Sequence, residues 1–150
     1  MRFILATAAL LALAACNQGA PPEPAVKVDG ATMMLPPVPG RPGAAYFTLR
    51  TNNDPTKIVS VTSPRAERIE LHQTREENGI SKMAPISDLT FPPGGEMKFN
   101  PGGRHAMLFG LDPALKAGDK IPLTFTFERA PAVTVDAEVQ GPGGGGHAGH

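Results

Sequence analysis

Glycine and proline recur along almost the whole chain, 17 of each among 150 residues, and this feature limits the possible folds most. Glycine raises the entropy cost of ordering a helix, and proline removes a hydrogen-bond donor from it. The sequence therefore predicts short strands joined by turns. A chain of about 100 to 150 residues buries enough surface to fold as one domain, so we expect a single compact core.

Short runs with β-branched or aromatic residues alternate with turn-forming clusters, which is typical of an all-β sandwich of about eight strands. The dipeptide Asn78-Gly79 separates two of these runs and predicts a hairpin. The eight strands are expected at Ala45–Arg50, Lys57–Thr62, Arg68–Thr74, Ile80–Ala84, Glu96–Asn100, His105–Gly110, Lys120–Glu128 and Ala132–Gln140.

Residues 1–15 have the pattern of a secretory signal peptide, because Arg2 precedes an apolar run too short to span a bilayer as a helix. The segment Leu13-Ala14-Ala15-Cys16 resembles the lipobox of bacterial lipoproteins, in which the cysteine is lipidated. Cys16 is the only cysteine, which excludes an intrachain disulfide. We expect export through the Sec pathway and a periplasmic protein held to the membrane by a lipid on Cys16.

The remaining chain divides by composition into three parts. Residues 16–24 are small, polar and proline-rich, as in a tether, and residues 25–140 form the expected domain. Residues 141–150 are a glycine-rich tail that carries two histidines and is expected to be flexible. Fourteen basic and fourteen acidic residues balance without a basic run, so nucleic acid is not an expected partner.

Two strands place chemically active side chains on one face. His72 alternates with Ile69 and Leu71 and should face away from them, and His105 and Met107 share a face because strands alternate with a period of two. The predicted hairpin would bring Met83 near His72. Two imidazoles and two thioethers suit Cu(I), because thioether sulfur is a soft ligand.

Each of these residues also has a structural interpretation when taken alone. A methionine in a β protein usually fills a gap in the core, which we expect of Met33, Met34 and Met97. A single histidine on a strand is more often hydrogen bonded than bound to a metal. No one of the four positions would justify a metal site without the others.

The spacing of the four residues resembles a known family. His72 is followed by ten residues, Met83, twenty-one residues, and then His105-Ala106-Met107. This resembles the H-x10-M-x21-H-x-M signature of the PCuAC family of periplasmic copper chaperones, and the resemblance extends over roughly residues 25–139. Two departures, Met33-Met34-Leu35-Pro36-Pro37 and Ala106, replace no ligand.

The resemblance implies a cupredoxin-like or immunoglobulin-like β-sandwich and a function without catalysis. It implies that His72, Met83, His105 and Met107 bind Cu(I). It also implies delivery of copper to the copper centre of a cytochrome oxidase, alongside Sco-type copper proteins. Many members end in a tail rich in His and Met, so His147 and His150 are candidates for a second site for Cu(II), although they can equally be incidental.

Two other classes of function are alternatives to a copper chaperone. A surface lipoprotein of the same fold could bind a protein or glycan and use its methionines only for packing. A blue-copper electron carrier needs a cysteine thiolate beside two histidines. Cys16 lies in the lipobox and cannot supply that thiolate.

Overall fold

The computed structural model describes residues 25–52 and 54–143, and this part of the chain folds into ten strands. The predicted signal peptide, the tether with Cys16 and all of the tail beyond residue 143 lie outside the described residues. The strands are β1 (Val26–Met34), β2 (Gly43–Thr51), β3 (Thr56–Thr62), β4 (Ala66–Glu77), β5 (Ile80–Pro85), β6 (Thr90–Phe91), β7 (Glu96–Phe99), β8 (Arg104–Leu111), β9 (Lys120–Phe127) and β10 (Val133–Gln140).

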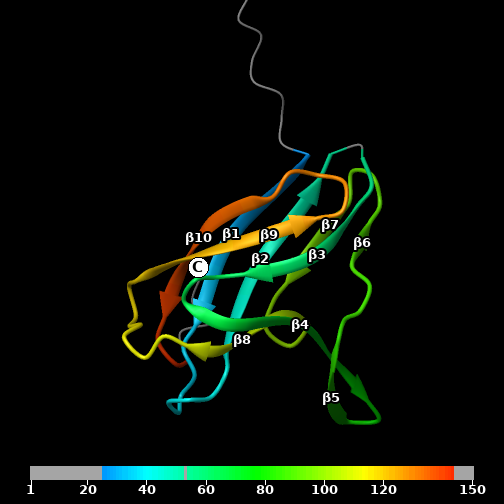
Figure 1. Cartoon of the computed structure of the whole chain (residues 1–150). Helices are drawn as coiled ribbons and strands as arrows, with labels where there is room; N and C mark the ends of the chain where they lie inside the picture. The colour runs from blue at the N-terminus through cyan, green and yellow to red at the C-terminus, as the bar shows by residue number, and fades with distance from the viewer. Residues whose placement is uncertain (1–24, 53, 144–150) are drawn as a thin grey trace, which may run out of the picture.

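The strands form one hydrogen-bonded path that curls into two packed layers (Figure 1). The path runs β5-β4-β8-β2-β1-β10-β9-β3-β6, and β7 pairs with β2 beside it. All pairs are antiparallel except β1 with β10. The predicted all-β sandwich is confirmed. No helix in the described ranges is long and apolar enough to cross a membrane.

The core lies between the layers and is built by alternating side chains of facing strands. Phe47 of β2 stacks on Phe99 of β7 with ring centroids 4.4 Å apart and meets Phe125 of β9 edge-on at 4.8 Å. Because β2 and β9 are not paired in the sheet, this aromatic cluster joins the two layers. Met33 is fully buried, as expected of a methionine that fills the core, while Met34 and Met97 are partly buried.

All eight predicted strands are present, with ends that agree to within three residues, but the structure has ten. The prediction missed β1 because Asp29-Gly30 has the composition of a turn. In the structure this dipeptide marks a register shift between Asp29 and Thr32, and Gly30 has a φ of 61°, so the strand continues through a bulge. β6 has only two residues and is too short to give a periodic signal.

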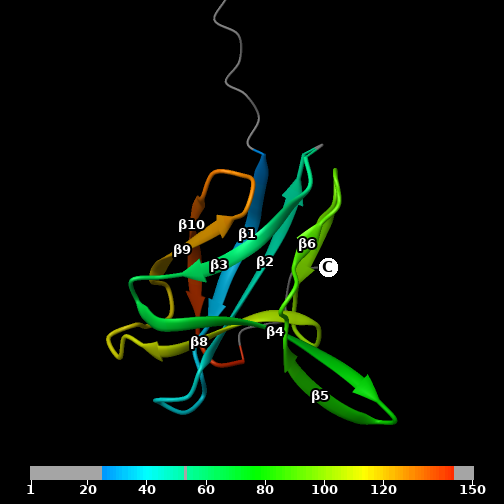
Figure 2. The same ribbon diagram turned by 45° about the vertical axis from the view of Figure 1, so that its right-hand side comes forward.

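Beyond Gln73, where its pairing with β8 ends, β4 continues with β5 as a hairpin that extends away from the sandwich, as Figure 2 shows. The predicted Asn78-Gly79 turn is confirmed, with φ angles of 55° and 76° at the two residues. Positive φ at both central residues suits the right-handed twist of the paired strands. Every residue of β5 is exposed, and β5 pairs only with β4 among the described strands.

The ionic contacts of Glu96 with Lys98 on its own strand and with Arg50 on β2 predict part of the acid sensitivity of the fold. Hydrogen bonds from Lys98 and Arg50 hold the pKa of Glu96 below its ordinary value of 4.5. A lowered pKa stabilises the fold above the ordinary pKa, and this contribution is lost as the pH falls through the lowered value. Glu96→Gln should therefore reduce the loss of stability below about pH 4.5, measured by urea unfolding at a series of pH values. If the free energy of unfolding of Glu96→Gln fell with pH as steeply as that of the unchanged protein, this prediction would be contradicted.

Candidate metal centre

His72 and His105 form a directly opposed pair on neighbouring antiparallel strands. They are register partners across β4 and β8, and their ring centroids lie 6.1 Å apart with planes inclined by 30°. A metal–nitrogen bond is about 2 Å, so two imidazoles that share one ion have centroids roughly 5 to 6.5 Å apart. The separation of the two rings is thus compatible with a common ion.

Met107 lies on the same face as this pair. It follows His105 by two residues on β8 and is the register partner of Glu70 on β4 and of Ala44 on β2. The alternate residues of β8, Ala106 and Leu108, point to the opposite face, where they are completely buried in the core. The alternation predicted from the sequence is therefore confirmed. The face of β8 that is turned toward the core carries small and apolar side chains.

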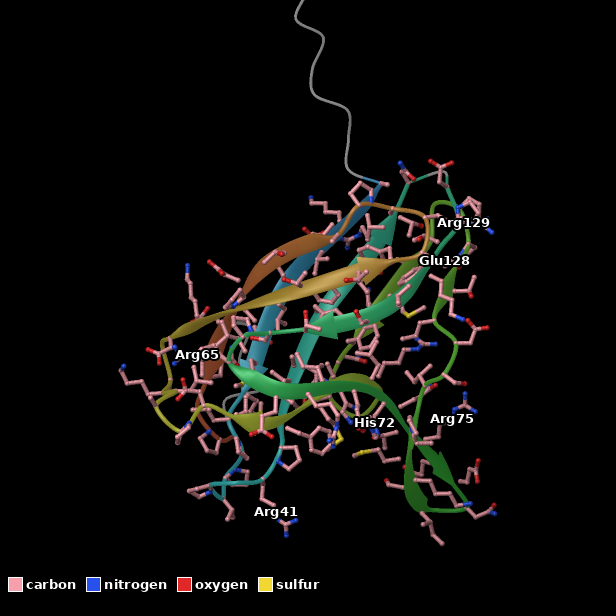
Figure 3. The ribbon with its side chains drawn as sticks, viewed as in Figure 1. Arg41, Arg65, His72, Arg75, Glu128 and Arg129 are labelled. Atoms are coloured by element: carbon pink, nitrogen blue, oxygen red, sulfur yellow. The ribbon has the colours of Figure 1, made fainter. Side chains whose placement is uncertain are left out.

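Met83 belongs to the hairpin. It is the register partner of Thr74, which lies two residues beyond His72 on β4, so Met83 shares the face of the histidines. Its exposed fraction is 54%, against 7% for His105. Figure 3 shows His72 where β4 passes from the sandwich into the hairpin. The four predicted residues thus share one face of three adjacent strands, with Met83 the most accessible.

A surface hollow of about 270 Å³ lies at this position. Three of the four predicted residues line it, and His72 adjoins it through its partner His105. Burial raises the pKa of Tyr46, another lining residue, so its hydroxyl stays protonated and uncharged at neutral pH. The lining residues are Pro42, Gly43, Ala44, Tyr46, Thr74, Met83, Gly102, His105 and Met107.

Each histidine uses one ring nitrogen in a hydrogen bond. Nε2 of His72 lies 3.0 Å from Oε2 of Glu70, and Nδ1 of His105 lies 3.0 Å from the carbonyl oxygen of Gly103. The second nitrogen of His72, Nδ1, is buried without a hydrogen-bond partner. Burying an unpaired polar atom costs free energy, so this nitrogen is a candidate metal-binding atom.

Glu70 is held in place by a neighbouring cation. Nε of Arg68 lies 2.7 Å from Oε1 of Glu70, and the Arg68 guanidinium lies 4.3 Å from the ring centroid of Phe109. The hydrogen bond with His72, followed by the charge of Arg68, lowers the pKa of Glu70, so the carboxylate is ionised at neutral pH. Arg68, Glu70 and Gly103 were not predicted to be parts of the site. Alternation of Arg68, Glu70 and His72 on one strand face was the available signal.

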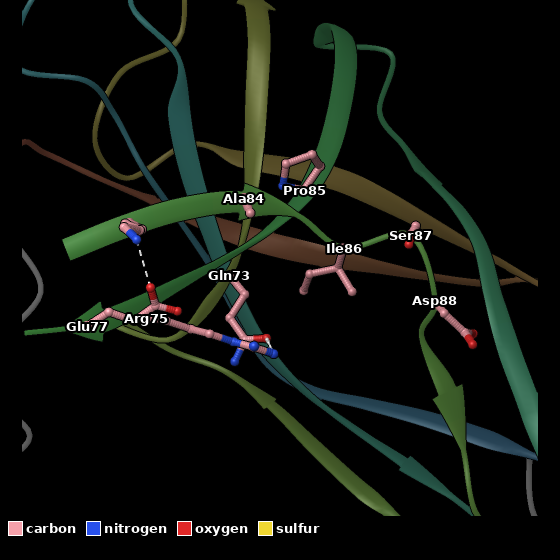
Figure 4. A pocket seen from close by; sticks show the side chains of 9 residues that line it. Gln73, Arg75, Glu77, Ala84, Pro85, Ile86, Ser87 and Asp88 are labelled. Carbon is pink, nitrogen blue, oxygen red and sulfur yellow. Dashed lines mark hydrogen bonds and ion pairs between the residues drawn. The ribbon is translucent and has the colours of Figure 1, made fainter. Parts of the chain in front are cut away.

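Another hollow lies beside the hairpin and does not include the predicted ligands. It has a volume of about 410 Å³ and is lined by both acidic and basic side chains, among them Arg75, Glu77 and Asp88 (Figure 4). Arg75 and Glu77 alternate with Thr74 on β4, so they belong to the opposite face of the hairpin. The residues that line this second hollow include no methionine, so it lacks the soft thioether donors found around His105.

Two imidazoles and two thioethers form an unusual donor set. Thioether sulfur binds soft ions, and imidazole accepts a wider range of transition metals. The arrangement thus suits a soft monovalent ion better than a hard one that requires oxygen. The other predicted ligands, His147 and His150, lie outside the described residues.

Comparison with solved structures defines the class of fold. A copper-bound PCuAC domain from PmoF2 superposes with a TM-score of 0.66 at 21% identity, covering 79% of this chain and 94% of that domain. The solution structure of Cu(I)-DR1885 from Deinococcus radiodurans gives a TM-score of 0.61 at 30% identity, covering 83% of each chain. The protein thus has the fold of PCuAC domains, as the sequence resemblance predicted.

The sequence also defines a family. Residues 26–139 match the family described as "LpqE-like: Putative lipoprotein LpqE-like", and the chain belongs to this family. An uncharacterized protein of Rickettsia prowazekii (strain Madrid E), RP573, is 39% identical over 88 residues, which are 57% of this chain and 48% of that protein. A protein of Leifsonia xyli subsp. xyli (strain CTCB07), named "Putative lipoprotein Lxx21020", is 37% identical over 86 residues, 56% of this chain and 52% of its own. The chain spans about half the length of these curated relatives.

Proposed function

We propose that this domain is a copper chaperone that binds one Cu(I) ion through His72, Met83, His105 and Met107. The observation that carries the proposal is the opposed His72–His105 pair, whose rings are 6.1 Å apart and which includes a buried Nδ1 atom without a partner. Two thioethers lie on the same strand face. Two solved structures of the same fold, the PCuAC domain from PmoF2 and Cu(I)-DR1885, are copper-bound, which supports the choice of ion.

The donor set favours Cu(I) over other biological metals. Methionine binds a metal without losing a proton, so only the histidines couple affinity to pH. Hard ions such as Mg²⁺ require oxygen ligands, and zinc sites are built from thiolate, imidazole and carboxylate. Thioethers also persist in an oxidising compartment where a thiolate site would be converted to a disulfide.

The positions of the ligands suit release of the ion as well as binding. His72, His105 and Met107 lie on strands held in the sandwich, whereas Met83 lies on the exposed strand of the projecting hairpin. Displacement of Met83 by a ligand of an acceptor protein would open one coordination position while three donors keep the ion. This arrangement supports a role in transferring the copper ion to an acceptor protein. Such a transfer exchanges metal ligands and breaks no covalent bond of a substrate.

The cellular setting follows from the lipobox and from the family. We propose that Cys16 is lipidated and that the domain faces the periplasm from a membrane anchor. The family description supports assignment as a secreted lipoprotein. The resemblance to PCuAC chaperones supports the copper centre of a cytochrome oxidase as the acceptor, with Sco-type copper proteins as further partners. It also supports a second site, for Cu(II), at His147 and His150.

The proposal predicts that Cu(I) stabilises the folded protein by mass action. At a free Cu(I) concentration a hundredfold above the Kd, binding adds about 2.7 kcal/mol to the free energy of unfolding. For a domain of this size the Tm should rise by roughly 10 °C. Thermal unfolding of the purified protein under anaerobic, reducing conditions measures this, with Zn²⁺ as the control ion. No shift with Cu(I), or an equal shift with Zn²⁺, would contradict the proposal.

A further inference from the structure

The hydrogen bonds of the two histidines leave different ring nitrogens free. A backbone carbonyl can only accept a hydrogen bond, so Nδ1 of His105 carries the proton that it donates to Gly103. An ionised carboxylate also only accepts, so Nε2 of His72 donates its proton to Glu70. A neutral imidazole has one N–H and one lone pair. In the neutral form of each ring, the lone pair is therefore on Nε2 of His105 and on Nδ1 of His72.

We infer that the two histidines bind the ion through opposite nitrogens, His72 through Nδ1 and His105 through Nε2, and that Glu70 is the residue that positions His72. The inference rests on the proposed function for the identity of the ion. The buried and unpaired Nδ1 of His72 supports it independently, because that atom has no other partner among the described residues.

Glu70 bonds Arg68 as well as His72. The Arg68 guanidinium bonds one carboxylate oxygen at 2.7 Å, the His72 ring bonds the other at 3.0 Å, and the guanidinium also lies over the Phe109 ring. Register pairing places these groups in sequence along one face, with Phe109 opposite Arg68, Met107 opposite Glu70 and His105 opposite His72. The pairing of β4 with β8 therefore positions both the proposed ligands and Glu70, which bonds one of them. Partners of this kind fix the orientation of a metal-binding imidazole and raise its basicity.

The choice of nitrogen affects where the ion lies. Nδ1 is the ring nitrogen nearer the main chain, and Nε2 is the more distant one. An ion bound to Nδ1 of His72 would therefore lie closer to the main chain of β4 than one bound to Nε2. Rotation of the ring to offer Nε2 instead would break the bond to Glu70.

Nitrogen NMR of protein labelled with ¹⁵N at its histidines tests the inference directly. In the metal-free protein we expect a proton on Nε2 of His72 and on Nδ1 of His105. Addition of Cu(I) should shift the resonances of the two unprotonated nitrogens and leave the two N–H groups in place. A shift at Nε2 of His72 would overturn the inference alone. Unshifted resonances at both rings would overturn the proposed function with it.

Variants of Glu70 test its role as a positioning residue. Glu70→Gln keeps an acceptor and should retain the exchange-protected Nε2 proton of His72 and most of the Cu(I) affinity. Glu70→Leu should lose the protection of that proton and weaken Cu(I) binding by about 10- to 100-fold, as is typical for such partners. Glu67→Leu is the matched control, since Glu67 is an exposed carboxylate on the opposite face of the same strand. Equal affinity and equal proton protection in Glu70→Leu and Glu67→Leu would overturn the role of Glu70.

Discussion

Replacement of Met107 by leucine should lower the Cu(I) affinity by more than about a hundredfold, beyond the effect typical of groups that only support a ligand. Leucine has nearly the volume of methionine but no sulfur, so the free energy of unfolding of the metal-free protein should change by less than about 1.5 kcal/mol. Competition for Cu(I) with a chelator of known affinity, together with urea unfolding of the metal-free variant, measures both quantities.

The methionines of the chain supply graded controls for this experiment. Met97→Leu removes a thioether on β7, away from the opposed histidines, and should leave the Cu(I) affinity unchanged. Met83→Leu should weaken binding less than Met107→Leu, because Met83 is on the exposed hairpin and 54% of its surface is accessible. If Met107→Leu binds Cu(I) as tightly as Met97→Leu, Met107 is not a ligand.

Truncation of Phe47 to alanine should destabilise the domain by about 3 to 5 kcal/mol, the usual cost for a buried aromatic side chain. Phe47 is 2% exposed and contacts both Phe99 and Phe125, so the change opens a cavity where the two layers meet. Such a loss is a large fraction of the stability of an ordinary domain. Urea unfolding measures it from the shift of the midpoint at a constant m-value.

Phe109 is the matched control for the core prediction. Its ring is only partly buried and lies under the Arg68 guanidinium on the outer face of β8. Phe109→Ala should therefore cost clearly less stability than Phe47→Ala. Equal losses in the two variants would contradict the assignment of the core to the aromatic cluster of Phe47, Phe99 and Phe125.

The strands could be predicted because their local patterns agree with their places in the sheet. β9 alternates buried and less buried residues along its length, and Asn78-Gly79 adopts the two positive φ angles that its composition favours. β1 could not be predicted, because the dipeptide Asp29-Gly30 is equally typical of a turn between two strands and of a bulge within one strand. The choice depends on the pairing of β1 with β2, which is a contact between distant segments.

The candidate site could be predicted from the alternation on β4 and β8 and from the ligand spacing. The register that opposes His72 to His105 could not, because it depends on the pairing of strands more than thirty residues apart. The support from Glu70 was missed for a related reason. Glutamates are common on exposed strand faces, and only the folded structure shows that its carboxylate reaches Nε2 of His72.

The central claim is that one Cu(I) ion is shared by two imidazole nitrogens and two thioether sulfurs. X-ray absorption at the copper K-edge of the Cu(I)-loaded protein measures this shell directly. The account predicts two nitrogen and two sulfur neighbours, with one sulfur lost in Met83→Leu and one in Met107→Leu. A shell of nitrogen and oxygen alone, or a sulfur count that neither substitution changes, would contradict it.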